Sequence, residues 1–475
     1  MTVNISEVVQ RIGRDLANNT YTLGELVTFA EREGLSLSRL VVAEAMAKED
    51  KAYEEILSSV MAEFKHNLAA LEVGLTRGRS FLLGTVGSDL ASFGDRAVID
   101  DSLINRAVVN TLATEVGNHE IGLRPCAGTG DSCPYTGLIK ALQQEGFTEE
   151  QVGLAAALIL KVGSIFRAGK RTTGCNMEGL GAGAAGTAAA LTDLRGGTPQ
   201  QVARAIVLAL SPTIGVPCTP RVMVSGLCAT HIGSAILIGH LASNLILRTS
   251  LPLDVDVDVM IAMAAKVHTQ AAPVITAINL AYMEPYFRKN PDLERFVNED
   301  IRKMETEEAS RIRQQAREEV RALLAGSHPL SQVLGDVVVG GSSIAVGSPT
   351  NMARIGHFLI SGKITKITVD LTTDLFVRRA INMPAILMAA LRGAKTDDVE
   401  MYRKVLTLPE IKSVEVEVNK VDVPEVQRIR IEATETGSWI DARNRGGGRV
   451  AIVAAEPSRE AALEVAAKLG IQVVD

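Results

Sequence analysis

Three cysteines stand at turns between apolar helical stretches in the middle of this chain. Cys175, Cys218 and Cys228 occur in the segments TTGCNMEGLG, GVPCTPRV and SGLCATH, each with Gly or Pro close by. Thiolates in such turns can accept hydrogen bonds from free backbone N–H groups, which suits the sulfur ligands of an iron-sulfur cluster. The intervals of 43 and 10 residues match no compact zinc motif. The spacing alone therefore leaves two interpretations open: a shared metal site, or buried thiols that pack as small hydrophobes.

Two further cysteines, Cys126 and Cys133, lie seven residues apart in the segment RPCAGTGDSCPYTG. They could form a redox pair, supply a fourth ligand in a resting state, or be inert. We favour inert packing for Cys133 and leave Cys126 open. A chain with five cysteines and no export signal is not expected to carry a disulfide framework.

Candidates for proton transfer lie beside the same motifs. They are His119 in GNHEIG, His231 in CATHIG and Glu178 in CNMEG. Imidazole titrates near neutral pH, which favours histidine as an acid or base. We take His231, three residues after Cys228, as the candidate catalytic residue, with a structural histidine as the alternative. His240 and His268 lie within apolar helices and are expected to be core residues.

The elements that must position these residues fall into four stretches. Residues 1–80 show apolar spacing among many charges and predict a lead-in of three amphipathic helices. Residues 81–290 are so rich in Ala, Gly and other small or apolar residues that we expect an all-α bundle whose helices bury one another. Thr198 and Gln201 predict a capping box within it. The bundle is the expected catalytic domain.

The pattern of charged and apolar residues changes twice after the bundle. Residues 291–328 predict a charged helix that either connects two domains or lies solvated on the bundle surface. Residues 329–475 show period-two runs (DVVVG, KITKITVDLT, SVEVEVN, VQRIRIEAT and RVAIVAA) with helices near 384–392 and 459–469. The predicted fold class is therefore multidomain, an all-α helical bundle followed by a smaller α+β domain.

Composition narrows the classes of function. The net charge of −6 gives no basic field, so no nucleic-acid partner is expected. The N-terminal residues MTVNISEVVQRIGRDL lack the apolar core of an export signal, and the apolar stretch 232–247 is interrupted by polar residues and falls short of a membrane span. We expect a cytoplasmic protein without a membrane partner. Apolar faces on such an Ala-rich bundle favour a homo-oligomer, with a homodimer as the simplest case.

Residues 122–247 resemble the catalytic α domain of the iron-sulfur L-serine dehydratases, a family that uses no pyridoxal phosphate. The resemblance is carried by RPCAGTGDSCPYTGLI, GCNMEGLGAGAAGTAAALTDLRGGTPQQV and GVPCTPRVMVSGLC, and the stretch VMAEFKHNLAALEVGLTRGRSFLLGTVGSDL resembles the start of that domain. The resemblance implies that Cys175, Cys218 and Cys228 ligate a 4Fe-4S cluster. Three ligands on four irons leave one iron open as a Lewis acid for a small amino-acid substrate.

The resemblance extends more weakly to the C-terminal part, where GGSSIAVGSPTNMARIG is similar to the Ser-rich loop of the family's β domain and ATETGSWIDARNRGGGRVAIV to its closing strands. The chain departs from the family at two places. The loop that binds the substrate carboxylate normally reads Pro-Thr-Asn-Gly, whereas here Cys126 and Ala127 replace Thr and Asn. The histidine of the β loop is replaced by Ser348.

These observations favour an L-serine ammonia-lyase (dehydratase) that converts L-serine to pyruvate and ammonium, with Cys126, Gly128, Thr129 and Ser132 as the candidate substrate-binding residues. The departures leave the substrate open, because the lost hydroxyl and amide would each have contributed roughly 0.5–1.5 kcal/mol. An L-cysteine desulfidase that uses the same cluster is one alternative, since a soft iron site binds sulfur well. A non-catalytic paralogue, acting as a cluster-bearing sensor or partner subunit, is the other.

Overall fold

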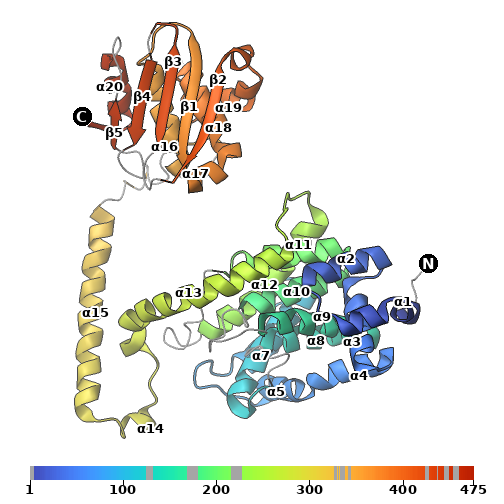
Figure 1. The fold of residues 1–475 in the computed structure, drawn as a ribbon. Coiled ribbons are helices and arrows are strands. Elements are labelled where there is room, and N and C mark those ends of the chain that lie inside the picture. The colour runs from blue at the N-terminus through green and yellow to red at the C-terminus, as the bar shows by residue number, and fades with distance from the viewer. Residues whose placement is uncertain are drawn as a thin grey trace. The chain divides into compact units, whose positions relative to one another are not determined.

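The computed structural model describes residues 5–124, 132–167, 180–214, 227–325, 329, 331, 337–340, 344–422, 427–435, 437–442, 449–452 and 459–474. These residues form two compact units, residues 1–320 and 321–475. Figure 1 shows helices throughout the first unit and a sheet flanked by helices in the second. The fold class expected from the sequence, an all-α part followed by a smaller α+β part, is confirmed.

The first unit contains the following helices: α1 (Ile5–Asn18), α2 (Leu23–Glu33), α3 (Leu37–Glu49), α4 (Tyr53–Glu63), α5 (Lys65–Thr76), α6 (Val86–Ser92), α7 (Ser102–Ile121), α8 (Cys133–Gln144), α9 (Glu149–Arg167), α10 (Gly183–Leu194), α11 (Pro199–Leu210), α12 (Leu227–Arg248), α13 (Val257–Met283), the short 3₁₀ helix η4 (Glu284–Tyr286), α14 (Pro291–Glu294) and α15 (Glu299–Ala325), which crosses into the second unit.

The expectation of three helices in the N-terminal lead-in was wrong, because the described residues before Arg77 form five. Short turns divide them: Gly34, with a φ of 68°, ends α2, and Thr22 and Ser36 cap the starts of α2 and α3. These helices are also not confined to the surface. Leu26 of α2 and Leu40 of α3 are fully buried in one core with side chains of α9 and α11. The lead-in thus packs as part of the helical unit.

Close contact between α5 and α7 fixes the part of the bundle that carries the site. A Cβ atom at Gly117 would lie 1.9 Å from the carbonyl oxygen of Ala70, and one at Gly74 would lie 1.8 Å from that of Ala113. Backbone atoms occupy those positions, so only glycine permits the helices to approach this closely. Side chains that follow on the two helices are thereby held near each other.

We therefore expect Gly117→Ala to lower the free energy of unfolding by about 1–3 kcal/mol, because the helices must separate to admit the methyl group. Gly233→Ala is the matched control. Its added Cβ would meet Val108 and Leu112 at 3.7 and 3.8 Å, which are ordinary contacts, so its stability should stay unchanged or rise by up to about 1 kcal/mol through helix propensity. Urea unfolding of both variants checks this, and equal stabilities would contradict it.

The later helices follow the expected pattern with one exception. The capping box of Thr198 and Gln201 at the start of α11 is confirmed. α12 is long and apolar enough to span a membrane by length and composition, yet it packs against α7, α10 and α11. α13 was expected in the interior, but Val274 and Ile278 in its C-terminal half are exposed. Its 27 residues extend well beyond the 12 residues of α11, against which it packs.

The second unit is built on a mixed six-stranded sheet with the order β2-β1-β3-β4-β5-β6. Strand pairs β1–β2 and β5–β6 are parallel and the other neighbours are antiparallel. Its elements are α16 (Ile344–His357), β1 (Ile364–Thr372), α17 (Thr373–Val377), α18 (Arg379–Arg392), α19 (Val399–Lys404), η6 (Val405–Thr407), η7 (Pro409–Ser413), β2 (Glu415–Val421), β3 (Arg428–Ala433), β4 (Gly437–Ala442), β5 (Arg449–Ile452), α20 (Arg459–Lys468) and β6 (Gln472–Val474).

Two expectations for this unit were wrong. Within the run DVVVG, the described residues 337–340 form no strand, and Val339 instead donates its N–H to the carbonyl of Thr396. Most of the expected Ser-rich loop is helix α16, which contains Pro349 and packs on α18 and β3. Buried Met352 and Ile355 on α16 show that core packing stabilises a helix there despite the Ser and Pro content.

Candidate functional site

The helices that begin after the cysteine-bearing segments meet in the bundle. Residues 125–131, 168–179 and 215–226, which carry Cys126, Cys175 and Cys218, lie outside the described residues, as do Gly128, Thr129 and Glu178. Cys228 is the second residue of α12, and its side chain is not described. The structure therefore describes the helices next to the expected site rather than most of its residues.

Gly183, at the start of α10, marks where these helices meet. A Cβ atom there would lie 3.0 Å from Cγ of Pro134 in the first turn of α8 and 3.1 Å from Cβ of Ala235 on α12. Ala235 is seven residues after Cys228, which places it about 10 Å along the helix axis. The N-terminal parts of α8, α10 and α12 thus converge, and each follows one of the three undescribed segments. Helix N-termini provide unpaired N–H groups and a favourable dipole for anionic groups.

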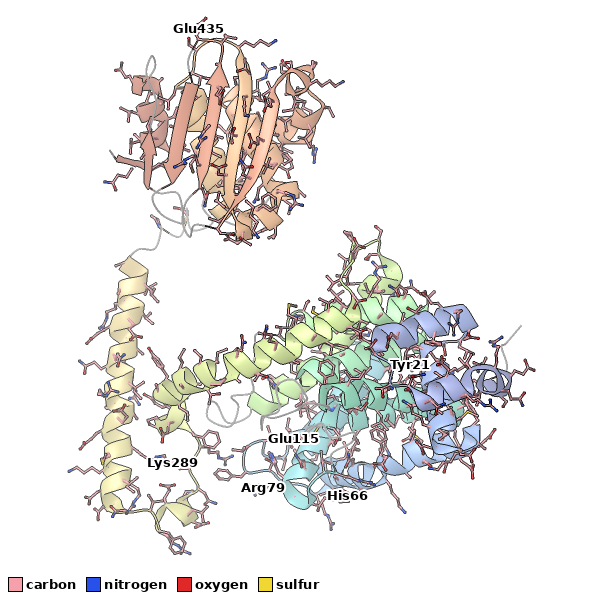
Figure 2. All side chains as sticks on the ribbon, viewed as in Figure 1. Tyr21, His66, Arg79, Glu115, Lys289 and Glu435 are labelled. Carbon is pink, nitrogen blue, oxygen red and sulfur yellow. The ribbon has the colours of Figure 1, made fainter. Side chains whose placement is uncertain are left out.

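A buried polar network lies at the start of α8. The thiol of Cys133 donates a hydrogen bond to Oε2 of Glu115 at 3.0 Å, and Nδ2 of Asn118 donates to the same oxygen at 3.1 Å. Nε2 of His119 lies 3.4 Å from Oε1 of Glu115, and its Nδ1 lies 2.6 Å from Oγ of Ser80. Cys133 is therefore a buried, hydrogen-bonded thiol, which agrees with the expected packing role. Figure 2 labels Glu115, which lies on α7.

The network shifts the protonation of its members. Burial by itself would raise the pKa of Glu115, but hydrogen bonds from His119, Cys133 and Asn118 outweigh burial and lower it. The hydrogen bond to Glu115 raises the pKa of His119 against the opposing effect of its own partial burial. Both ring nitrogens of His119 contact neighbouring side chains, Glu115 and Ser80. This histidine therefore orients Glu115 and stabilises its charged form, and does not present a free nitrogen as a base.

Ser132, an expected substrate-binding residue, is fully described and buried. Its hydroxyl accepts a hydrogen bond from Nδ2 of Asn67 at 2.9 Å and donates to the carbonyl of Arg124 at 3.3 Å. A direct bond from this hydroxyl to a ligand would require the bond to Arg124 to be exchanged. Asn67 itself was not singled out from the sequence, because its partners lie more than 50 residues away.

The other expected residues lie on α12, α13 and α16. His231 is half-buried near the start of α12, one turn after Cys228. His240 is half-buried rather than a core residue. Its ring nitrogens contact Nη2 of Arg195 at 3.1 Å and Nδ2 of Asn244 at 2.9 Å, and burial followed by the Arg195 charge lowers its pKa. The backbone of Ser348 lies in α16 of the second unit, and the side chains of Ser348 and His268 are not described.

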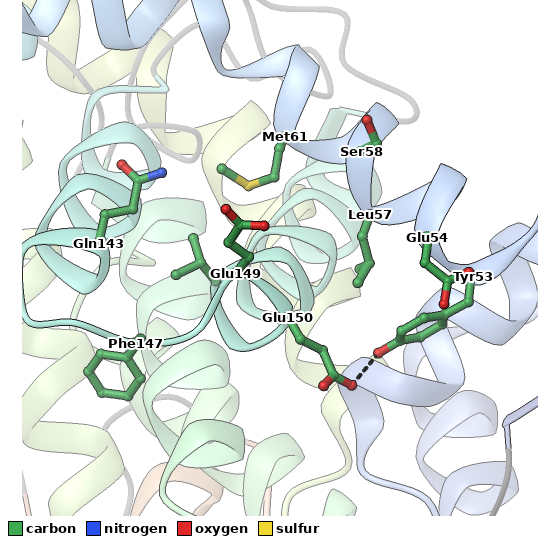
Figure 3. A pocket seen from close by; sticks show the side chains of 10 residues that line it. Tyr53, Glu54, Leu57, Ser58, Met61, Gln143, Phe147, Glu149 and Glu150 are labelled. Atoms are coloured by element: carbon green, nitrogen blue, oxygen red, sulfur yellow. Dashed lines mark hydrogen bonds between the residues drawn. The ribbon is translucent and has the colours of Figure 1, made fainter.

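A pocket lies between α4 and the start of α9 (Figure 3). It has a volume of about 770 Å³ and is lined by apolar side chains such as Leu57, Met61 and Phe147 and by the carboxylates of Glu54, Glu149 and Glu150. The hydroxyl of Tyr53 donates to Glu150 at 2.8 Å, and burial together with this bond raises the pKa of Tyr53. Among the described residues, none of those expected from the sequence lines this pocket. Across the part of the chain that the structure describes, no three His, Cys, Asp or Glu side chains gather as a metal site requires.

The comparisons with known proteins match the helical unit. The family model described as "Serine dehydratase alpha chain" matches residues 32–277, more than half of the chain. The "Probable L-serine dehydratase, alpha chain" of Bacillus subtilis (strain 168) is 26% identical over 213 residues, which cover 41% of this chain and 68% of that protein. The family match contains all five cysteines and ends within α13.

Proposed function

The chain belongs to the serine dehydratase alpha chain family, and from this membership we propose that it is an iron-sulfur lyase that eliminates water and ammonia from a small L-amino acid such as L-serine. Family membership supports a serine dehydratase-like lyase. The cluster, the substrate and the roles of single residues are our proposal. The observation that carries it is the convergence of α8, α10 and α12 at Gly183, directly after the segments that hold the cysteines.

We propose that Cys175, Cys218 and Cys228 would hold a 4Fe-4S cluster. Two of these cysteines lie in the segments that precede α10 and α12, and the third is in the first turn of α12. Gly183 has no side chain, which lets three helix N-terminal parts approach one another. Their N–H groups favour the negative charge of thiolates and sulfide. When bound, such a cluster would supply an open iron as a Lewis acid for a hydroxyl and carboxylate.

We assign the remaining tasks to this chain's own residues. Cys126, Gly128 and Thr129, in the segment between Arg124 and Ser132, would bind the substrate carboxylate through backbone and side-chain donors. Ser132 anchors the end of that segment. His231, one turn after Cys228 on α12, would accept the α-proton, since imidazole titrates in the neutral range. The apolar walls of α8, α10 and α12 would exclude water from the reacting atoms.

The test is to incubate anaerobically purified protein with L-serine and with L-cysteine, each as a separate substrate. We expect pyruvate and ammonium to form from serine. The His231→Ala variant should keep its iron content, and its kcat should be lower by about 10²–10⁴-fold. His240→Ala is the control on the same helix, because that side chain bonds to Arg195 and Asn244.

The alternative activities give different outcomes in the same assay. Sulfide and pyruvate from cysteine, without turnover of serine, would identify a desulfidase that uses the same cluster. Absence of product from either substrate, together with a cluster spectrum that no amino acid changes, would overturn the lyase proposal in favour of a non-catalytic role.

A further inference from the structure

The pocket between α4 and the start of α9 offers apolar surface to a small ligand (Figure 3). Its volume of about 770 Å³ lies within the range of about 300–1,000 Å³ that is usual for small-molecule sites. Leu57 and Met61 reach it from α4, and Phe147 from the turn between α8 and α9. All three side chains are only partly buried. An apolar group placed on them would remove this surface from water, which is favourable.

The charged groups of the pocket all have the same sign. Its described lining contains Glu54, Glu149 and Glu150, and no lysine, arginine or histidine. The Glu150 carboxylate has partners, because it accepts the hydroxyl of Tyr53 at 2.8 Å and lies 3.3 Å from Nη2 of Arg39. Within the described part of the chain, the side chains of Glu54 and Glu149 have no ion-pair or hydrogen-bond partner. Two carboxylates beside the apolar surface are thus left without a cation.

Tyr53 shows the effect of these charges at one end of the pocket, where Figure 3 draws its bond to Glu150. Burial, then the hydrogen bond to Glu150 and the charge of Glu150, raise the pKa of Tyr53. The Arg39 charge opposes this shift and the Glu54 charge adds to it. The local potential is therefore negative despite Arg39. It would attract a cationic ligand group and repel a carboxylate.

We propose that this pocket binds a small organic cation with an apolar body, such as a primary amine that carries an aromatic ring and no carboxylate. The ring would lie on Leu57, Met61 and Phe147, and Glu54 and Glu149 would attract the ammonium group. Ten residues line the pocket, fewer than the roughly 20–30 per side of a stable protein interface, so a small molecule fits better than a protein. None of these residues is used in the proposed lyase function, so the proposal does not depend on it.

Four probes separate the two features of this ligand. Phenethylamine carries a ring and an ammonium group, and methylamine carries the ammonium group with almost no apolar body. Hydrocinnamate carries a ring and a carboxylate, and phenylalanine carries a ring and both charged groups. In ligand-observed NMR titrations of the full chain, we expect phenethylamine to bind with a Kd in the millimolar range. The other three probes should each bind at least about tenfold more weakly.

Variants of the lining locate the binding. Glu54→Gln and Glu149→Gln should each raise the Kd for phenethylamine about threefold, and the double variant about tenfold, as expected for exposed charge pairs. Glu31→Gln is the matched control, because it also removes one exposed carboxylate and Glu31 does not line the pocket. Its Kd should equal that of wild type. Ser58→Trp places a large side chain in the pocket from an exposed position of α4 without changing the charge, and should abolish binding.

Several outcomes would overturn the proposal. No binding of phenethylamine to wild type, equal Kd values in the Glu149→Gln and Glu31→Gln variants, or full binding in Ser58→Trp would each remove this site. Hydrocinnamate or phenylalanine binding as tightly as phenethylamine would show that the ligand is not selected as a cation, and equally tight methylamine would show that the apolar lining does not contribute. Much tighter binding of a peptide that contains phenylalanine and lysine, lost in Ser58→Trp, would identify a protein partner in place of a small molecule.

Discussion

Replacing Cys175, Cys218 or Cys228 with Ser, one at a time, is expected to remove the proposed iron-sulfur cluster and the proposed lyase activity. A cubane held by three thiolates has no spare protein ligand, and a serine hydroxyl is a harder and less acidic donor than a thiol. Oxygen-free wild-type protein should contain about four irons and about four sulfides per chain, and each variant close to none. Iron and sulfide analysis with the anaerobic visible spectrum measures this directly.

Cys133→Ser is the matched control for those variants. The thiol of Cys133 is buried and donates to Glu115, and a serine hydroxyl can donate to the same oxygen. We expect this variant to fold and to keep its iron. The cluster assignment would be wrong if one of the three cysteine variants retained a full cluster, or if Cys133→Ser lost it.

The elements that the sequence predicted well are those with local signals. The capping box at Thr198 and Gln201 starts α11 as expected, because both residues act within a single turn. The strands β1, β2 and β3 follow period-two runs, with Ile367 and Val369 of β1 buried. The N-terminal helices were miscounted although Thr22 and Glu25 form a similar capping box. The apolar spacing there continues across turns too short to interrupt it.

The network around the candidate site could not be predicted, because its members are distant along the chain. Asn67 bonds to Arg124 and Ser132, which lie 57 and 65 residues away. Nothing in the local sequence distinguishes Asn67 from a helix-surface amide. The close approach of Gly117 to the Ala70 carbonyl could not be predicted either, because a glycine within a helical pattern does not show which backbone will approach it. Tertiary packing chooses such partners.

Glu115→Gln is expected to lower the free energy of unfolding by about 1.5–3 kcal/mol near pH 6, because it removes the charge that His119, Cys133 and Asn118 stabilise. The lowered pKa of Glu115 contributes stability above its ordinary value of 4.5, and this is lost as the pH falls through the folded value. The raised pKa of His119 contributes stability below 6.5, lost as the pH rises through the folded value. The His119 share is reduced by solvent screening, since 28% of that side chain is exposed.

The stability difference between wild type and Glu115→Gln should therefore be largest between pH 4.5 and 6.5, where both contributions are present, and smaller on either side. Urea unfolding across this range measures the difference, and a histidine NMR titration should show the pKa of His119 lower in the variant than in wild type. Glu120→Gln is the control, because the Glu120 carboxylate is exposed and accepts the N–H of Arg79. A stability difference that does not vary with pH, or an unchanged pKa of His119 in the variant, would show that His119 does not stabilise the ionised form of Glu115. The start of α8 would then be held on α7 by the Cys133 bond and packing alone.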